Sequence, residues 1–166
     1  MNQVSIRQAT KDDLPSLEWN GEYTHFRRLY TDTFTLMQQT KAIIWIAELN
    51  GGGLIGQCFV SLKGNRPELA DGTTRAYIYG FRIQPQFRNQ GIGTSIMRTI
   101  EDDLEQRRFQ QVTLNVGQDN HAARRFYERL QYLVIGSDPG RWSYIDDKGK
   151  RRDVHEPAWR MIKDLD

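Results

Sequence analysis

The sequence is poor in cysteine, in proline and in long apolar segments. Cys58 is its only cysteine, so an internal disulfide is excluded, which agrees with a reducing cytoplasm. The longest apolar stretches, such as residues 42–47, are far shorter than the roughly 20 residues that a membrane-spanning helix needs. Met1 is followed by polar residues rather than by a basic run and an apolar segment, so no signal peptide is expected. These absences predict a soluble cytoplasmic protein without a membrane partner.

The charge of the chain is nearly balanced. Lysine and arginine number 23 against 21 aspartate and glutamate, which gives a net charge of +2. This balance argues against a nucleic-acid partner, because such proteins usually carry a strong basic excess. The local basic clusters at 107–108, 124–125 and 148–152 are more typical of solvated helix faces and a charged turn. A length of 166 residues suits a single domain, residues 1–166, with a usable core.

Hydrophobic periodicity divides the chain into strands and helices. Short alternating or β-branched runs predict strands at 4–7, 42–47, 54–62, 76–83, 112–116, 132–135, 141–145 and 154–162. Helical spacing predicts helices over 94–108 and 120–130, and the segment 19–39 is expected to form one or two more. On the strand at 76–83, period-two alternation places alternate residues from Tyr77 to Ile83 on one face. Strand pairs at the ends and strand–helix–strand units between them indicate a mixed α/β fold.

A glycine-rich turn joins the strand at 76–83 to the helix at 94–108. Arg88, Gly91 and Gly93 form an R-x-x-G-x-G pattern in this turn. The first amides of a helix lack internal acceptors and carry partial positive charge, so they attract an anion such as a pyrophosphate. Arg88 adds charge and Thr94 adds a hydroxyl donor. A dinucleotide fingerprint and a Walker loop are excluded by their missing residues, whereas an ordinary strand–helix turn remains an alternative on glycine spacing alone.

Four segments, by their order and spacing, resemble the GCN5-related N-acetyltransferase (GNAT) family. They are residues 6–14, residues 54–57, the segment 81–93 with the glycine-rich turn, and residues 120–130. The third segment is the most specific, and the four together span most of the chain. The resemblance implies the acyl-CoA N-acyltransferase fold, in which a central mixed, largely antiparallel sheet is flanked by helices and splays apart at the cofactor cleft.

The resemblance also implies a donor and its binding residues. The donor is acetyl-CoA, a co-substrate that needs no metal. The main chain of residues 81–83 is expected to pair with the pantetheine arm, residues 89–94 to hold the pyrophosphate, and Asn120 to bond the pantetheine. The implied cofactor-binding residues are Phe81, Arg82, Ile83, Arg88, Asn89, Gln90, Gly91, Ile92, Gly93, Thr94, Asn120 and Tyr127.

Acetyl transfer to an amine needs a proton acceptor for the amine and a proton donor for the leaving thiolate. The resemblance places Tyr127 near the departing sulfur, so Tyr127 is the predicted acid, with a packed helix aromatic as the alternative. The candidates for the base are Tyr77, Tyr79 and Glu156, and His25 is a further candidate because histidine is the usual proton carrier near neutral pH. Each of the four also has a plainer interpretation as a core or surface residue.

Two departures from the family pattern bear on the acceptor. Ribosomal-type protein N-terminus acetylases carry a base where this chain has Asn115, and histone-type enzymes carry a glutamate where it has Tyr77. Neither protein-acetylating type is therefore favoured. The aromatic segments 18–30 and 142–159 also contain acidic residues that can attract a cationic amine. These acidic residues are Glu18, Glu22, Asp146 and Glu156.

The sequence thus predicts an acetyl-CoA-dependent N-acetyltransferase. Its acceptor is expected to be the primary amine of a small or medium-sized molecule, which attacks the acetyl group directly. The alternatives are a non-catalytic CoA-binding sensor or interaction module, and a protein N-terminal or lysine acetyltransferase. The aromatic residues of the last third of the chain also suit a homodimer interface.

Overall fold

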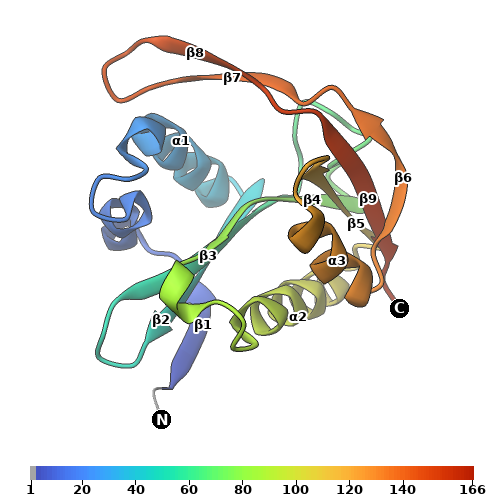
Figure 1. The fold of residues 1–166 in the computed structure, drawn as a ribbon, viewed down its shortest axis with the longest axis horizontal. Helices are drawn as coiled ribbons and strands as arrows, with labels where there is room; N and C mark the ends of the chain where they lie inside the picture. Colours follow the sequence, from blue (N-terminus) through green and yellow to red (C-terminus); the bar gives the residue numbers. More distant parts are fainter. Residues whose placement is uncertain (1–2) are drawn as a thin grey trace.

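The computed structural model describes residues 3–166, which form a seven-stranded sheet, a two-stranded sheet and flanking helices (Figure 1). The large sheet has the strand order β1-β2-β3-β4-β5-β9-β6, and β7 pairs with β8. The strands are β1 (Val4–Gln8), β2 (Ala42–Leu49), β3 (Leu54–Ser61), β4 (Arg75–Ile83), β5 (Gln111–Gly117), β6 (Leu133–Asp138), β7 (Arg141–Ile145), β8 (Arg151–His155) and β9 (Ala158–Asp164). The helices are η1 (Lys11–Glu18), η2 (Thr24–Phe26), α1 (Arg27–Gln38), η3 (Pro85–Phe87), α2 (Ile92–Gln106) and α3 (His121–Arg129), where η marks a 3-10 helix. Among the strands of residues 3–166, only β4 and β5 pair in parallel, so the predicted mixed, largely antiparallel sheet is confirmed.

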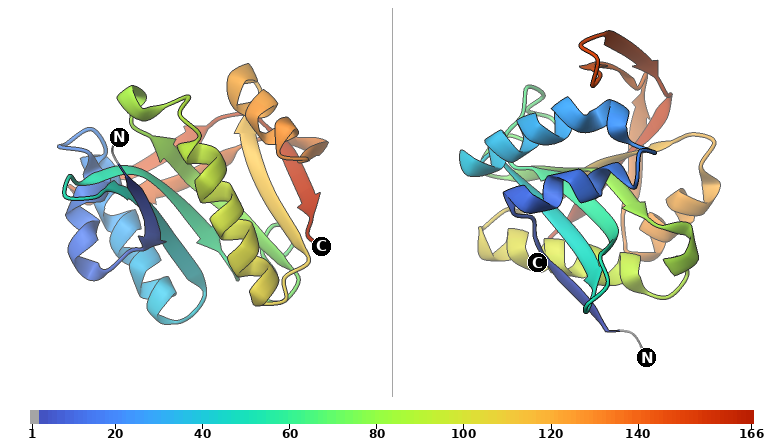
Figure 2. Two further views of the ribbon diagram at one scale, coloured as in Figure 1. Left: turned by 90° about the horizontal axis from the view of Figure 1, so that it is seen from below. Right: turned by 90° about the vertical axis from the view of Figure 1, so that its left-hand side faces the viewer.

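Helices cover both faces of the large sheet (Figure 2). α2 packs on one face through Ile96, Ile100 and Leu104, which are completely buried. Their helical spacing forms the apolar stripe expected from the sequence, and burial of each such side chain contributes about 1.5–3 kcal/mol. η1 and α1 pack on the opposite face, where Leu17 and Tyr30 join a second apolar cluster. The sheet therefore separates an α2 face from an α1 face.

The predicted strand at 154–162 is wrong as a single element. β8 ends at His155 and β9 begins at Ala158, with Glu156 and Pro157 between them. Pro157 interrupts the pairing because it has no amide hydrogen and a fixed φ. At this junction the chain passes from the two-stranded sheet into the large sheet. Glu156 consequently lies at a junction and not within a strand.

β4 and β5 separate after a short parallel pairing. Their register runs from Arg75 opposite Gln111 to Ile78 opposite Leu114 and ends there. Beyond this point β4 continues beside β3 as far as Ile83, while β5 continues beside β9. No strand of residues 3–166 pairs with the β5-facing edge of β4 after Ile78. The splayed sheet expected from the family resemblance is therefore confirmed.

A β-bulge at Gly80 lies in the separated part of β4. Phe59 of β3 is opposite Tyr79 and Gln57 is opposite Arg82, so one residue of β3 faces two residues of β4. The extra residue reverses the side-chain alternation along the strand. Gly80 allows the bulge because its φ is +62°, a left-handed value that other residues rarely adopt.

The prediction that alternate residues from Tyr77 to Ile83 share one face is wrong because of this bulge. Tyr79 packs with the cluster beneath α1, whereas Phe81 and Ile83 pack with the cluster beneath α2. The side chain of Arg82 turns toward the α1 face instead, with its guanidinium carbon 4.1 Å from the ring centre of Tyr23. The two faces of β4 thus receive different residues from those that strict alternation assigns.

The β7–β8 hairpin, residues 141–155 and called the arm below, arches from the β6–β9 side of the molecule toward α1 (Figure 1). Its turn follows the predicted position, and the carboxylate of Asp146 accepts hydrogen bonds from two backbone amides of that turn. Trp142 and Tyr144 on the arm lie beside Phe26, with ring centres 6.1 Å and 4.9 Å away. The arm therefore reaches across the α1 face of the sheet and contacts the start of α1.

No helix within residues 3–166 is long and apolar enough to cross a membrane. The expectation that a signal peptide is absent concerns the segment that begins at Met1. Residues 1–2 of this segment lie outside the described part of the chain.

Replacement of Gly80 by alanine is expected to destabilise the fold. The added Cβ would lie 2.8 Å from Cδ2 of the buried Phe59 ring. The alanine would also have to keep the left-handed φ of this position. We expect the free energy of unfolding, measured in urea, to fall by about 2–4 kcal/mol. Gly136→Ala on β6 is the matched control, since nothing lies within 4 Å of its added Cβ, and it should cost less than about 1 kcal/mol. Equal losses in the two variants would contradict a requirement for glycine in the bulge.

Candidate functional site

The loop between β4 and α2 presents a row of unused amides. The backbone amides of residues 89–94 donate no hydrogen bond to a protein group within residues 3–166, and the first amide of α2 that does so belongs to Ser95. Gly91 caps the helix with a φ of +82°, and Asn89 is also left-handed at +60°. Unpaired amides at a helix N-terminus carry partial positive charge. This geometry suits the anion that the sequence predicted for the loop.

Arg88 and Gly93 fix this loop against its neighbours. Arg88 Nε donates a hydrogen bond of 2.9 Å to the carbonyl oxygen of Ile83, the last residue of β4. A Cβ on Gly93 would lie 3.3 Å from the ring of Phe126 and 3.4 Å from the ring of Phe81. Glycine at this position therefore lets the start of α2 approach β4 and α3 closely. The guanidinium of Arg88 keeps further donors beside the row of amides.

The helix α3 carries two of the predicted site residues, Asn120 and Tyr127. The side-chain oxygen of Asn120 accepts a hydrogen bond of 3.2 Å from the Ala123 amide and caps the helix. Its side-chain nitrogen is the part left for a ligand. The ring of Tyr127 meets Phe81 edge-on, with ring centres 6.4 Å apart. Tyr127 thus lies on the α2 face, beside the part of β4 that has separated from β5.

Tyr127 is poorly solvated, and this changes its acidity. Burial raises the pKa of Tyr127 above its usual value, and the neighbouring Cys58 and Tyr77 add to the shift. Its hydroxyl makes no hydrogen bond with the described residues 3–166. A tyrosine with a raised pKa keeps its proton at neutral pH, so it suits proton donation better than proton acceptance.

A pocket of about 490 Å³ lies on the α1 face, between α1, β4, β5 and the arm. Three of the predicted catalytic residues, Tyr77, Tyr79 and Glu156, line this pocket together. Tyr127 is not among its lining residues, because it lies on the other side of the sheet. Other lining residues are the aromatics Phe26, Tyr30, Phe59 and Trp142 and the charged residues Arg66, Arg82, Asp138 and Arg141. The splayed strands thus separate a loop that suits an anion from a largely aromatic pocket.

The two tyrosines of the pocket are poor proton acceptors. Burial raises the pKa of Tyr77 to about 12 and also raises the pKa of Tyr79. Their rings stack with centres 5.7 Å apart. Glu156 is exposed and forms no ion pair with any group in residues 3–166. Of the three residues, Glu156 is therefore the one whose chemistry suits a base.

Asp138 is the second carboxylate of the pocket and is almost completely buried. It accepts hydrogen bonds from the Gly140 amide at 2.8 Å, from Arg66 at 2.9 Å and from Arg160. Burial alone raises the pKa of Asp138, but the amide and the two guanidiniums outweigh it and hold the pKa at about 2. This ion-paired group could not be predicted from the sequence, because the arginines are distant along the chain and only the Asp-Pro-Gly turn is local.

Several predicted acceptor-site residues lie elsewhere. Glu18 accepts hydrogen bonds from Arg27, and Asp146 from Arg152, so neither carboxylate lines the pocket. Both carboxylates already have an arginine partner, which leaves them less charge to attract a cationic amine. His25 packs beside Phe26 and the arm and is also absent from the pocket lining. Across residues 3–166, no group of three or more His, Cys, Asp or Glu side chains is arranged to hold a metal ion.

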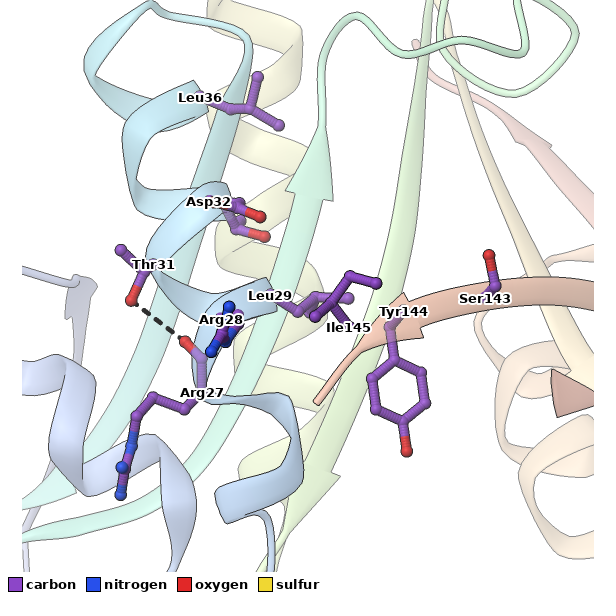
Figure 3. A pocket seen from close by; sticks show the side chains of 10 residues that line it. Arg27, Arg28, Leu29, Thr31, Asp32, Leu36, Ser143, Tyr144 and Ile145 are labelled. Carbon is purple, nitrogen blue, oxygen red and sulfur yellow. Dashed lines mark hydrogen bonds between the residues drawn. The ribbon is translucent and has the colours of Figure 1, made fainter. Parts of the chain in front are cut away.

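A larger hollow, of about 820 Å³, lies between α1 and β7 (Figure 3). Leu29 of α1 and Ile145 of β7 both line it, and Thr31 on its α1 wall donates a hydrogen bond of 3.1 Å to the carbonyl of Arg27. None of its lining residues comes from β4, β5 or α3. Despite its size, this hollow is lined only by residues of α1 and β7 and not by the splayed strands. The smaller pocket is therefore the better candidate site.

Comparison with known proteins agrees with this geometry. A sequence profile of the Acetyltransferase (GNAT) family matches residues 6–132. An N-acetyltransferase from Archaeoglobus fulgidus is 30% identical over 135 residues, which cover 75% of this chain and 89% of that protein. N-alpha-acetyltransferase 30 from Schizosaccharomyces pombe is 40% identical over 81 residues, or 43% of this chain and 54% of that protein. The structure of yncA from Salmonella typhimurium with its cofactor acetyl-CoA has the same fold, with a TM-score of 0.74 at 13% identity over 99% of this chain and 95% of that one.

Replacement of Asp138 by asparagine is expected to lower the free energy of unfolding by about 2 kcal/mol near neutral pH, because two arginines lose a buried partner. The pKa of Asp138 is depressed in the folded state, so its contribution is complete above roughly pH 4 and is lost as the pH falls toward 2. Urea unfolding of both proteins across this range should show a difference that shrinks with falling pH. Asp153→Asn, which removes an exposed ion pair with Arg151, is the control and should cost less than about 1 kcal/mol. A pH-independent difference would contradict the assignment.

Proposed function

Because the chain belongs to the Acetyltransferase (GNAT) family and transfers acetyl groups from acetyl-CoA, we propose that its acceptor is the primary amine of a small or medium-sized molecule. The amine binds in the pocket on the α1 face and attacks the acetyl group directly. The observation that carries the proposal is the gap between β4 and β5. The unused amides of residues 89–94 lie at one end of the separated β4, and the aromatic pocket lies on the opposite face.

The donor side of the proposal rests on backbone groups without protein partners. The amides of residues 89–94 match the needs of a pyrophosphate, which favours a helix N-terminus and a row of donors. The edge of β4 at residues 81–83 has no strand beside it on the β5 side, so an extended pantetheine can pair there like an added strand. Arg88 and the side-chain nitrogen of Asn120 supply further donors.

The proposed acid and base come from opposite faces of the sheet. Tyr127 keeps its proton because burial raises its pKa, and it donates that proton to the leaving thiolate. Glu156 removes the proton of the ammonium group, directly or through water, because it is the pocket carboxylate without an arginine partner within residues 3–166. Tyr77 and Tyr79 remain protonated, so their proposed role is to donate hydrogen bonds to a water or to the acceptor.

The position of the arm favours a small molecule over a protein as the acceptor. Trp142 and Tyr144 pack against Phe26, so the arm and the start of α1 meet beside the pocket. An extended polypeptide would need that passage to be open. A protein N-terminus is the second candidate, favoured by the similarity to N-alpha-acetyltransferase 30. Against it, Asn115 lines the pocket where ribosomal-type enzymes carry a base, and an amide cannot take up a proton.

Release of free thiol from acetyl-CoA in the presence of amines, amino acids, aminoglycosides and peptides tests the proposal. We expect release with at least one small amine, and we expect Tyr127→Phe to lower kcat roughly 100-fold because the thiolate loses its proton donor. Tyr132→Phe is the matched control, since the Tyr132 hydroxyl donates to Glu101 at 2.8 Å and has no role in the proposed chemistry. Release with peptides alone would favour the second candidate, and binding of CoA without release would favour a non-catalytic module.

Gly91→Val tests the role of the loop. A β-branched residue resists the φ of +82° at this position, so the loop shifts and its amides lose their common direction. We expect the Kd of CoA, measured by calorimetry, to rise about 10-fold. Gly51→Val, in the turn between β2 and β3, carries a similar φ of +79° and equally open surroundings, so it controls for backbone strain. A comparable rise in both variants would remove the support for a pyrophosphate at residues 89–94.

A further inference from the structure

The side chain of Arg82 enters the acceptor pocket rather than the donor side. The bulge at Gly80 turns it toward α1, and it is one of the pocket-lining residues. Its guanidinium carbon lies 4.1 Å from the ring centre of Tyr23 and 5.3 Å from that of Phe26. One nitrogen donates a hydrogen bond of 3.3 Å to the Tyr30 hydroxyl. These aromatic contacts hold the guanidinium in a fixed place at the pocket wall.

Arg82 has no acidic partner among residues 3–166. By contrast, Arg66 of the pocket lining binds Asp138, as does Arg160 of β9. A guanidinium has five N–H donors, and Arg82 uses one of them on a neutral hydroxyl. A half-buried cation without an anion beside it is costly, and the cost falls when an anion arrives. The free donors and the charge of Arg82 therefore favour a carboxylate on the incoming molecule.

The remaining charged residues of the pocket also favour an acceptor that carries a carboxylate. Asp138 is saturated by two guanidiniums and one amide, and one of these guanidiniums, that of Arg66, also pairs with Glu68, so this group has no charge left for an acceptor amine. Arg141 adds a further positive charge at the pocket wall. Glu156 is the one carboxylate of the pocket that no arginine of the described chain neutralises. An acceptor with only an amine meets a net positive pocket, whereas an acceptor with an amine and a carboxylate finds a partner for each group.

We infer that the acceptor is a small amine that also carries a carboxylate, such as a free amino acid, and that the side chain of Arg82 binds this carboxylate. The aromatic walls formed by Phe26, Tyr30 and Trp142 then receive the body of the molecule. This inference rests on the proposed function, because it names the acceptor class of the same pocket. It adds a carboxylate to the cationic amine that the sequence predicted for the acceptor.

The test uses the 20 amino acids as acceptors, each in three forms. These forms are the free amino acid, its carboxamide and the amine that remains after removal of the carboxyl group. Acetylation is followed by thiol release, and kcat/KM is measured for each form. Wild-type protein should prefer the best amino acid over its carboxamide by about 10- to 100-fold, the range for a charge-assisted hydrogen bond. Arg82→Gln should remove most of this preference, and Arg82→Lys should restore part of it, mainly through KM.

The ratio of kcat/KM for the amino acid to kcat/KM for its carboxamide distinguishes recognition of the carboxylate by Arg82 from a structural role of Arg82. If Arg82 only supports the fold, Arg82→Gln lowers kcat/KM equally for the acid and the carboxamide, which would overturn the inference. Loss of the preference in Arg141→Gln but not in Arg82→Gln would also overturn it. Thiol release with amines that lack a carboxylate, at rates equal to or above those of the amino acids, refutes the inference and leaves the proposed function intact. Absence of release with every amine refutes the proposed function and, with it, the inference.

Discussion

The early end of the pairing between β4 and β5 is the constraint on which both halves of the site depend. The two strands pair only as far as Ile78, while β3 holds β4 in place up to Ile83. Continued pairing would satisfy the edge of β4 with β5 and would leave no passage between the two faces of the sheet. A parallel strand pair buried within a sheet normally has no such opening. The edge that the fold leaves unsatisfied is the edge at which a donor and an acceptor can meet.

The bulge at Gly80 distributes side chains between these two faces. It sends Phe81 toward α3, where it packs against Tyr127, and it sends Arg82 toward α1. One inserted residue thus directs neighbouring side chains of the same strand to opposite faces of the sheet. The crowded contact between Gly80 and Phe59 explains why a glycine is found here. The backbone geometry of β4 therefore decides which side chains, and hence which charges, face the pocket.

Much of the donor side could be predicted from the sequence because its determinants are local. The glycine spacing from Arg88 to Gly93, the helix after it and the strand before it lie within one continuous segment. The acceptor side could not be predicted to the same degree, because its groups come together only in the folded chain. Asp138 gains two arginine partners from distant segments, and the acids at 18 and 146 are neutralised by neighbours that periodicity does not reveal. A one-residue bulge was equally invisible to an argument from strict alternation.

The arm joins the large sheet through two short connections, one at residues 139–140 and one at Glu156 and Pro157. The family profile ends at residue 132, before β6, so the part of the chain that carries the arm lies beyond the shared pattern. A hairpin that is tethered at its base can change its sequence with little effect on the rest of the sheet. Divergence of this one hairpin is a route by which related enzymes can acquire new acceptors while they keep a common donor.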